Sequence, residues 1–453
     1  MQMSQQKIQI KKILLAIIIG LVFFALSFKL FTLNQSALIG TIALLVTLWT
    51  NEGLPLGVVS LLPIILFPAF SILGTKATSI NYSNPIIYLF LGGFLLAIAV
   101  EKTDLHKWIS DKILGIFPPT SKGIIFSLVF TSGILSSVLS NTTTTLLLIS
   151  VALFLTKNMH LKMRFALAIA YGASVGGILT PIGTPPNLIL LGVMEDHSMK
   201  IIPFLKWVSL VAPLVFGMFI VVATLLSVGV RHIKVEATLN PKPLDLRQKK
   251  VFLIIGFLVS ILLLNASFEP YWGGLGLSEA GLMLTCGLLL FAPPFNILNW
   301  TEDKVKVPYE IMFLFGAGFS IAKAFSQTGL ADEVASYLLS ITNLPPILLL
   351  LSIAVLITFT TEITSNTALI SIMLPVIYSV AEQSGINTTL FMMVATVCAS
   401  YAFMLPIATA PNAIAMSSGA VQIKDMARYG VILNLVGIGL IVLISEFFWK
   451  GLL

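Results

Sequence analysis

The amino-acid sequence predicts an all-α protein that crosses a membrane many times, and its composition is the first reason. The 453 residues are 57% hydrophobic and only 10% charged, whereas a soluble domain carries about 25% charged residues. The apolar runs reach the roughly 20 residues that a transmembrane helix needs. The net charge of +7 is therefore interpreted as a signal of orientation in the membrane, and not of nucleic-acid binding.

The second reason is an internal repeat with a constant offset of 225 residues. The paired blocks are SNT at 140–142 and 365–367, PIGTPPN at 181–187 and PIATAPN at 406–412, and the runs at 86–105 and 311–330. The second pair shares five identities in seven, and the third shares nine in twenty. Because one gapless offset joins three separate blocks, the chain is predicted to be a tandem duplication.

Positive charge is distributed oppositely in the two copies. The basic residues of two first-copy loops are Lys102, Lys107, Lys112, Lys122, Lys157, Lys162 and Arg164. The matching second-copy stretches 326–347 and 382–389 contain no Lys or Arg. In the third loop the bias is reversed, because the second copy has Lys424 and Arg428 where the first copy has only Lys200. By the positive-inside rule, equivalent loops face opposite sides of the membrane. The copies are therefore predicted to be inverted repeats, with the N-terminus in the cytoplasm and the C-terminus outside.

Eleven membrane spans are predicted, one before the duplication and five in each copy. They lie near 13–31, 37–51, 54–72, 85–101, 165–193, 203–229, 250–267, 275–297, 309–325, 388–418 and 428–449. The first run is long for a signal peptide and lacks a small-residue cleavage site, so it is interpreted as a retained helix. The predicted organisation is an N-terminal helix at 1–35, a first repeat at 36–230, a cytoplasmic linker at 231–250 and a second repeat at 251–453.

The segments 121–157 and 346–380 do not fit as spans. Each has two apolar arms around an SNT, and each must return to its starting side for the charge pattern to hold. They are predicted to be re-entrant hairpins with SNT at the tip, the first entering from the inward side and the second from the outward side. The stretches 104–114 and 330–340 are predicted to be amphipathic helices along opposite surfaces.

The hairpin tips and the two proline-rich segments predict a ligand site near the membrane midplane. Prolines in PIxTxPN interrupt one span of each copy, at 165–193 and 388–418, and irregular backbone is tolerated in the membrane where it lines a protein cavity. Helix amino ends suit an anion, while unwound carbonyls suit a small hard cation such as sodium. An Asn side chain offers both an oxygen and an NH2 group, so it can serve both ligands.

Other interpretations of these polar residues remain open. A single polar run in an apolar segment is more often helix capping, although two copies favour a site. Glu362 is either a proton carrier or, with more weight, a structural partner of tip donors. Cys286 and Cys398 lie in apolar runs and indicate neither a disulfide nor a metal motif. Four histidines and sparse charges assemble no catalytic constellation, so an enzyme is not expected.

The paired motifs resemble those of the divalent anion–sodium symporters. The similar stretches are GGILTPIGTPPN at 176–187, TEITSNTA at 361–368, LPIATAPN at 405–412 and the two SNT tips. The resemblance covers nearly the whole chain. It implies eleven spans, two opposed hairpins, a homodimeric scaffold and an elevator-like transport domain. Members carry succinate, fumarate, malate, oxoglutarate, citrate or, in some branches, sulfate.

The resemblance also implies roles for individual residues. The substrate carboxylates would meet Ser140, Asn141, Thr142, Ser365, Asn366 and Thr367, with Thr184 and Thr409 nearby. The first sodium site would use Ser136, Ser140, Asn141 and the carbonyl of Gly183. The second would use Thr361, Thr364, Asn366 and the carbonyl of Ala408. Sodium is then the coupling ion, and no other cofactor is expected.

The expected function is sodium-coupled import of C4-dicarboxylates through the cell membrane. The extra nucleotide-binding-like domains of some sulfate-type relatives are absent from the sequence, which favours carboxylates. A sodium-independent dicarboxylate exchanger, or antiporter, is the alternative within the class. An anion channel is a further alternative, because opposed hairpins also line pores.

Overall fold

The computed structural model describes residues 2–114, 116–153, 155–230, 243–265, 273–338 and 345–453. All regular elements within these residues are helices, as the predicted fold class requires. Those before the linker are α1 (Gln2–Ser27), α2 (Leu33–Asn51), α3 (Leu56–Ala69), α4 (Thr75–Ser79), α5 (Pro85–Lys102), α6 (Leu105–Leu114), α7 (Ser121–Ser136), α8 (Asn141–Ala152), α9 (Met159–Gly176), α10 (Pro185–Asp196) and α11 (Phe204–Ser227). Those after it are α12 (Leu246–Asn265), α13 (Glu279–Leu289), α14 (Trp300–Asp303), α15 (Tyr309–Gln327), α16 (Leu330–Leu338), α17 (Pro346–Thr360), α18 (Asn366–Ser384), α19 (Thr388–Cys398), α20 (Ala410–Ser417) and α21 (Ile423–Ile444).

Seven helical segments in the described part of the chain are long and apolar enough to cross a membrane. They are Lys7–Ser27, Leu33–Asn51, Thr75–Lys102, Phe204–Ser227, Leu246–Asn265, Asn366–Ser384 and Ile423–Trp449, and the pair α14–α15, bent by 53°, can form an eighth. The chain is therefore a polytopic membrane protein. The predicted spans 54–72 and 275–297 contain shorter helices, of 14 and 11 residues. The full count of eleven spans stays a prediction.

The predicted interruptions of the spans at 165–193 and 388–418 both occur. α9 ends at Gly176 and α10 begins at Pro185, while α19 ends at Cys398 and α20 begins at Ala410. Each helix ends well before the proline that the sequence suggested as its terminator, Pro181 or Pro406. Proline alone therefore does not explain these ends; side chains that bond the unwound backbone, described below, supply the rest.

The two hairpins have the predicted two-armed form, α7–α8 and α17–α18. The second arms begin at Asn141 and Asn366, which keeps the 225-residue offset. α18 is itself one of the helices long enough to cross a membrane. α6 and α16 occupy the stretches predicted as surface helices, although 339–340 lie outside the described residues, as do 231–242 of the linker and 266–267 of the seventh predicted span.

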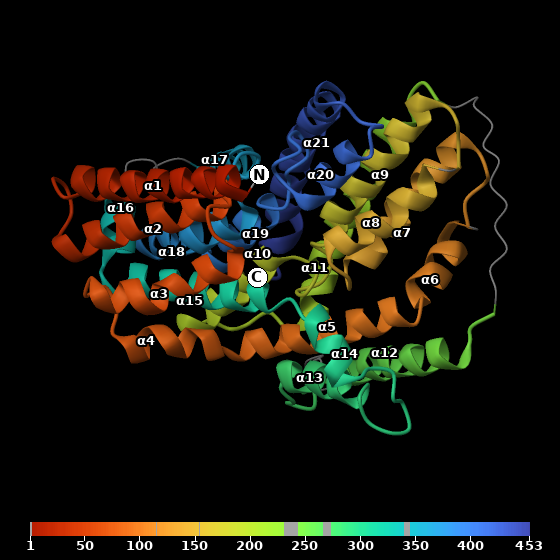
Figure 1. Ribbon diagram of the computed structural model, residues 1–453, viewed down its shortest axis with the longest axis horizontal. Helices are drawn as coiled ribbons and strands as arrows, with labels where there is room; N and C mark the ends of the chain where they lie inside the picture. The colour runs from red at the N-terminus through yellow and green to blue at the C-terminus, as the bar shows by residue number, and fades with distance from the viewer. Residues whose placement is uncertain (1, 115, 154, 231–242, 266–272, 339–344) are drawn as a thin grey trace.

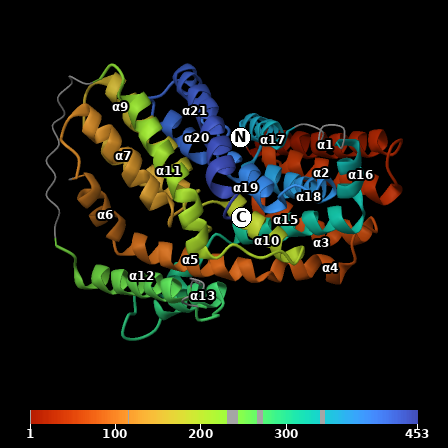
Figure 2. The same cartoon turned by 180° about the vertical axis from the view of Figure 1, so that it is seen from behind.

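The helices form two groups around the site (Figure 1). In one, α1 packs on α2, α2 and α3 pack on α15, and α18 packs on α15 and α16; their buried side chains form one hydrophobic cluster. In the other, α7, α9 and α11 lie side by side, and α8, α20 and α21 join them, as Figure 2 shows from behind. α5 runs along one edge of the molecule and packs against α13.

Candidate functional site

Each SNT lies where the second arm of a hairpin begins. Asn141 and Asn366 are the first residues of α8 and α18, so each tip presents the amino end of a helix. Ser140 Oγ accepts a hydrogen bond from the Thr143 N–H at 3.0 Å, and Ser365 caps α18 in the same way. Helix amino ends carry free N–H groups and a partial positive charge. The polar run therefore caps a helix and also leaves donors at the tip.

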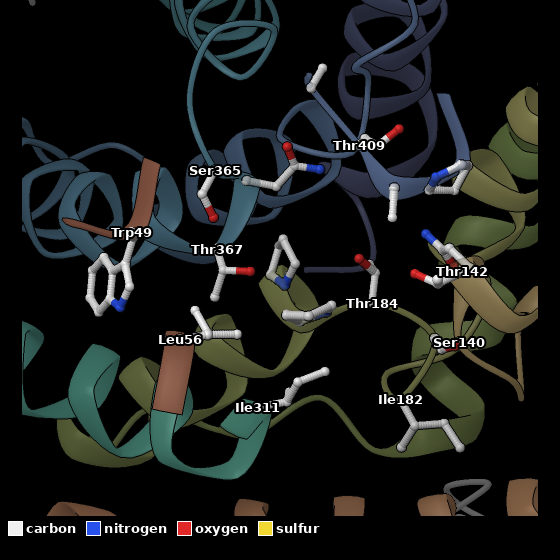
Figure 3. A pocket seen from close by; sticks show the side chains of 18 of the residues that line it. Trp49, Leu56, Ser140, Thr142, Ile182, Thr184, Ile311, Ser365, Thr367 and Thr409 are labelled. Carbon is white, nitrogen blue, oxygen red and sulfur yellow. The ribbon is translucent and has the colours of Figure 1, made fainter. Parts of the chain in front are cut away.

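Both tips and both broken helices line one cavity of about 630 Å³. Of the residues that the sequence singled out, the cavity is lined by Ser140, Asn141, Thr142, Gly183, Thr184, Thr364, Ser365, Asn366, Thr367, Ala408 and Thr409. Figure 3 shows Ser365 and Thr367 on one side, Ser140 and Thr142 on the other, and Thr184 and Thr409 between them. The fold thus brings together all eight predicted substrate residues, which are up to 269 positions apart (Thr409 minus Ser140).

Two residues predicted to bind sodium lie behind the tips and do not line the cavity. Ser136 and Thr361 are fully buried. Ser136 Oγ donates to Asn141 Oδ1 at 2.5 Å, and Thr361 Oγ1 donates to Asn366 Oδ1 at 2.7 Å. The two halves therefore build the same pair, a hydroxyl bonded to the amide oxygen of a tip. In each half these two oxygens lie close enough together to serve one cation.

The rest of the cavity lining comes from α2, α3 and the segment between them, α5 and α15. Its side chains are mainly apolar and include Trp49, Leu56, Phe90, Phe94 and Ile311. Among the described residues that line the cavity, Glu52 is the one charged side chain, and no Lys or Arg is present. Sequence reasoning missed this part of the lining, because nothing in the local pattern distinguishes an apolar residue facing a cavity from one facing lipid.

The unwound segments of the two broken helices are held by matching asparagines. Asn187 Nδ2 donates to the carbonyls of Gly177 (3.2 Å) and Thr180 (2.9 Å). At the same offset, Asn412 Nδ2 donates to the carbonyls at 402 (2.9 Å) and 405 (3.0 Å). Both side chains are fully buried. They satisfy carbonyls freed where the helices end, and their recurrence in TPPN and APN is the sequence signal that would have found them.

Glu362 holds only the second unwound segment. Its carboxylate accepts hydrogen bonds from the backbone N–H groups of Phe403, Met404 and Leu405 at 2.8–3.1 Å, and from Asn434 Nδ2 of α21 at 2.7 Å. The expected structural role is thus seen, although the donors belong to the broken helix and α21 instead of the hairpin tip. The first-half counterpart is Ser137, whose backbone carbonyl accepts a bond from the Thr180 hydroxyl.

The oxygen atoms at the first tip are placed to bind a small cation. A Cβ atom placed on Gly177 would lie 2.9 Å from Asn141 Oδ1 and 3.1 Å from the carbonyl oxygen of Gly183. Two predicted sodium ligands therefore converge on one point that no side chain occupies. Among the described residues no group of three His, Cys, Asp or Glu could hold a metal ion. A cation here would be held by neutral oxygens, the donor type that hard cations prefer.

Comparison with known proteins gives consistent results. A family model described as citrate transporter (CitMHS) matches residues 42–396. The chain is 32% identical over 476 residues to the sodium-dependent dicarboxylate transporter SdcS of Staphylococcus saprophyticus, covering 96% of this chain and 91% of that protein. It is 32% identical over 469 residues to SdcS of Staphylococcus aureus, covering 95% and 90%.

Two solved structures share the fold. The YdaH transporter of Alcanivorax borkumensis aligns with a TM-score of 0.60 at 16% identity, over 83% of this chain and 89% of that one. MtrF of Neisseria gonorrhoeae aligns with a TM-score of 0.59 at 13% identity, over 81% and 83%. At these identities the likeness concerns the arrangement of the helices alone.

Proposed function

Because the chain belongs to the citrate transporter family, we propose that it imports C4-dicarboxylates such as succinate, fumarate and malate together with sodium ions. The chain is a multi-pass membrane transporter and not an enzyme. The observation that carries the proposal is the single cavity lined by both SNT tips and both broken helices, without a cationic side chain among its described lining residues. Such a site near opposed hairpins is typical of secondary transporters.

The geometry supports a mechanism in which substrate and cation bind together. The amino ends of α8 and α18, with the hydroxyls of Thr142, Thr184 and Thr367, offer donors to two carboxylates. Sodium, when bound, supplies the positive charge that the neutral lining lacks. The amide oxygens of Asn141 and Asn366 are shared with it. Because no fixed cation holds the dianion, release of sodium weakens the site and allows the substrate to leave.

Uptake by purified protein in liposomes tests this function. With labelled succinate outside, an inward sodium gradient should drive accumulation, and uptake should saturate. Vesicles preloaded with dicarboxylate and kept without a sodium gradient separate the alternatives. Exchange under those conditions, without net sodium-driven uptake, would identify the sodium-independent exchanger. Uptake that neither saturates nor shows trans-stimulation would identify a channel.

The proposed topology is inverted, with an N-terminal helix at 1–35, repeats at 36–230 and 251–453 joined by a cytoplasmic linker, and the C-terminus outside. The test uses single cysteines, Lys162→Cys and Glu382→Cys, in a background where the buried Cys286 and Cys398 are replaced. An impermeant thiol reagent should label the two positions from opposite faces of the membrane. Labelling of both from one face would contradict the inverted repeat.

A homodimer with an elevator-like transport domain is the proposed assembly, in keeping with the family resemblance. The first helix and the spans flanking each hairpin would form the fixed support against which the hairpins move. Light scattering of purified protein in detergent should therefore give twice the mass of one 453-residue chain. A monomer at all concentrations tested would rule the dimer out.

A further inference from the structure

Trp207 of α11 is hydrogen-bonded to the unwound segment of the first broken helix. Its side chain is fully buried, and its indole Nε1 donates to the backbone carbonyl of Ile178 at 3.0 Å. Ile178 lies just after the end of α9 and 29 positions before Trp207 in the chain. The bond satisfies a carbonyl that the break in the helix leaves free. It therefore ties the unwound segment to a neighbouring helix.

The bonded carbonyl lies next to the backbone contact that shapes the first proposed cation site. A Cβ atom on Gly183 would collide with the backbone of Gly177, so these two residues pack backbone against backbone. A Cβ atom on Gly177 would lie 3.1 Å from the Gly183 carbonyl oxygen and 2.9 Å from Asn141 Oδ1, the two candidate ligand oxygens. A shift of residues 177–178 would therefore move one ligand oxygen relative to the other.

The bond from Trp207 has no equivalent in the second half, although the structure describes both residues involved. The residue at the 225-residue offset is Ile432 of α21, whose side chain carries no donor. The second unwound segment is held by Glu362, whose first-half counterpart is Ser137. Each segment thus has one duplicated anchor, an asparagine, and one anchor of its own. Trp207 is the anchor that belongs to the first half.

We propose that Trp207 is a positioning residue for the first cation site. By holding the Ile178 carbonyl, the indole N–H keeps Gly177 and Gly183 at the separation from Asn141 that a small cation needs. Residues that hold metal ligands in place typically change metal affinity by about 10- to 100-fold when they are lost. Trp207 acts through the ligand geometry and not by contact with the ion or the substrate. This inference rests on the proposed sodium-coupled function.

Trp207→Phe keeps an aromatic ring in the core and removes the N–H donor. Half-saturation of uptake by sodium should then need about tenfold more ion. The apparent affinity for succinate should stay near the wild-type value once sodium is saturating, because the groups that meet the carboxylates are unchanged. A residue that only filled space in the core would not separate these two quantities.

Trp449→Phe is the matched control. Trp449 is also fully buried, and its Nε1 donates to the backbone carbonyl of Leu210 in α11 at 2.8 Å. The substitution removes the same ring atoms and the same kind of hydrogen bond, but the carbonyl belongs to a regular helix and not to the unwound segment. Both variants should lose similar thermal stability. Only Trp207→Phe should need more sodium.

Ion binding is also measured directly, so that the result does not depend on uptake alone. Purified protein in detergent, without dicarboxylate, is titrated with sodium, and the rise in unfolding temperature gives the half-saturating concentration. If Trp207→Phe does not fold, benzothienylalanine at position 207 makes the same test. That residue keeps both fused rings and has sulfur in place of the N–H group.

A higher sodium requirement in the Trp207 variant alone, with succinate affinity retained, supports the inference. An equal shift in the Trp449 variant, or wild-type sodium requirement in both, would overturn it while leaving sodium-coupled transport intact. If wild-type protein shows neither stabilisation by sodium nor sodium-driven uptake, the proposed coupling fails and the inference fails with it.

Discussion

Asn366→Asp is expected to reduce dicarboxylate transport by a hundredfold or more while cation binding persists. The substitution keeps the oxygen that accepts the Thr361 hydroxyl at 2.7 Å, so the tip retains its shape. It removes the NH2 donor and puts a negative charge beside a dianion. Two like charges about 4 Å apart repel by about 4 kcal/mol at an effective dielectric constant of 20, and about 1.4 kcal/mol corresponds to a tenfold change.

The measurement is succinate uptake in liposomes across a range of substrate concentrations, together with stabilisation by sodium. Asn141→Asp should behave alike, because Asn141 bonds Ser136 as Asn366 bonds Thr361. Thr144→Val is the control: the Thr144 hydroxyl is buried and has no hydrogen-bond partner among the described residues, so its loss should change little. Unchanged apparent affinity for succinate in Asn366→Asp would mean that the tips do not bind the anion and serve only as helix caps.

Glu362→Ala is expected to lower the stability of the protein by about 3 kcal/mol or more and to abolish transport. The carboxylate is 3% exposed and accepts from three consecutive backbone N–H groups, 403–405, and from Asn434. Each buried donor left without a partner costs about 1–3 kcal/mol. The unwound segment that precedes the Ala408 carbonyl would lose its anchor, and the second proposed cation site would lose its geometry.

Thermal unfolding in detergent and uptake in liposomes check this expectation. Glu333→Ala, which removes an exposed carboxylate from α16, is the matched control and should leave both quantities near wild type. If Glu362→Ala were as stable as wild type and lost only pH-dependent transport, Glu362 would be a proton carrier, and the hydrogen bonds from its four donor groups would be incidental to stability.

Several features of the site were predictable from the sequence because they are local or duplicated. A run of hydroxyl and amide residues between apolar arms predicts a helix start, and α8 and α18 do begin there. Duplication then paired the two tips and the two interruptions without any knowledge of the fold. The breaks themselves were predicted from proline, which ends helices, although the observed ends at Gly176 and Cys398 lie further upstream.

By itself the sequence determined an all-α membrane fold with two hairpins and two broken helices, because hydrophobic run length, turn chemistry and repetition are properties of short segments. Tertiary packing alone decided that these segments share one cavity, that Trp49 and Glu52 face it, and that Glu362 binds backbone 41–43 positions away. Such contacts depend on which helices pack together, and no local pattern of residues specifies that choice.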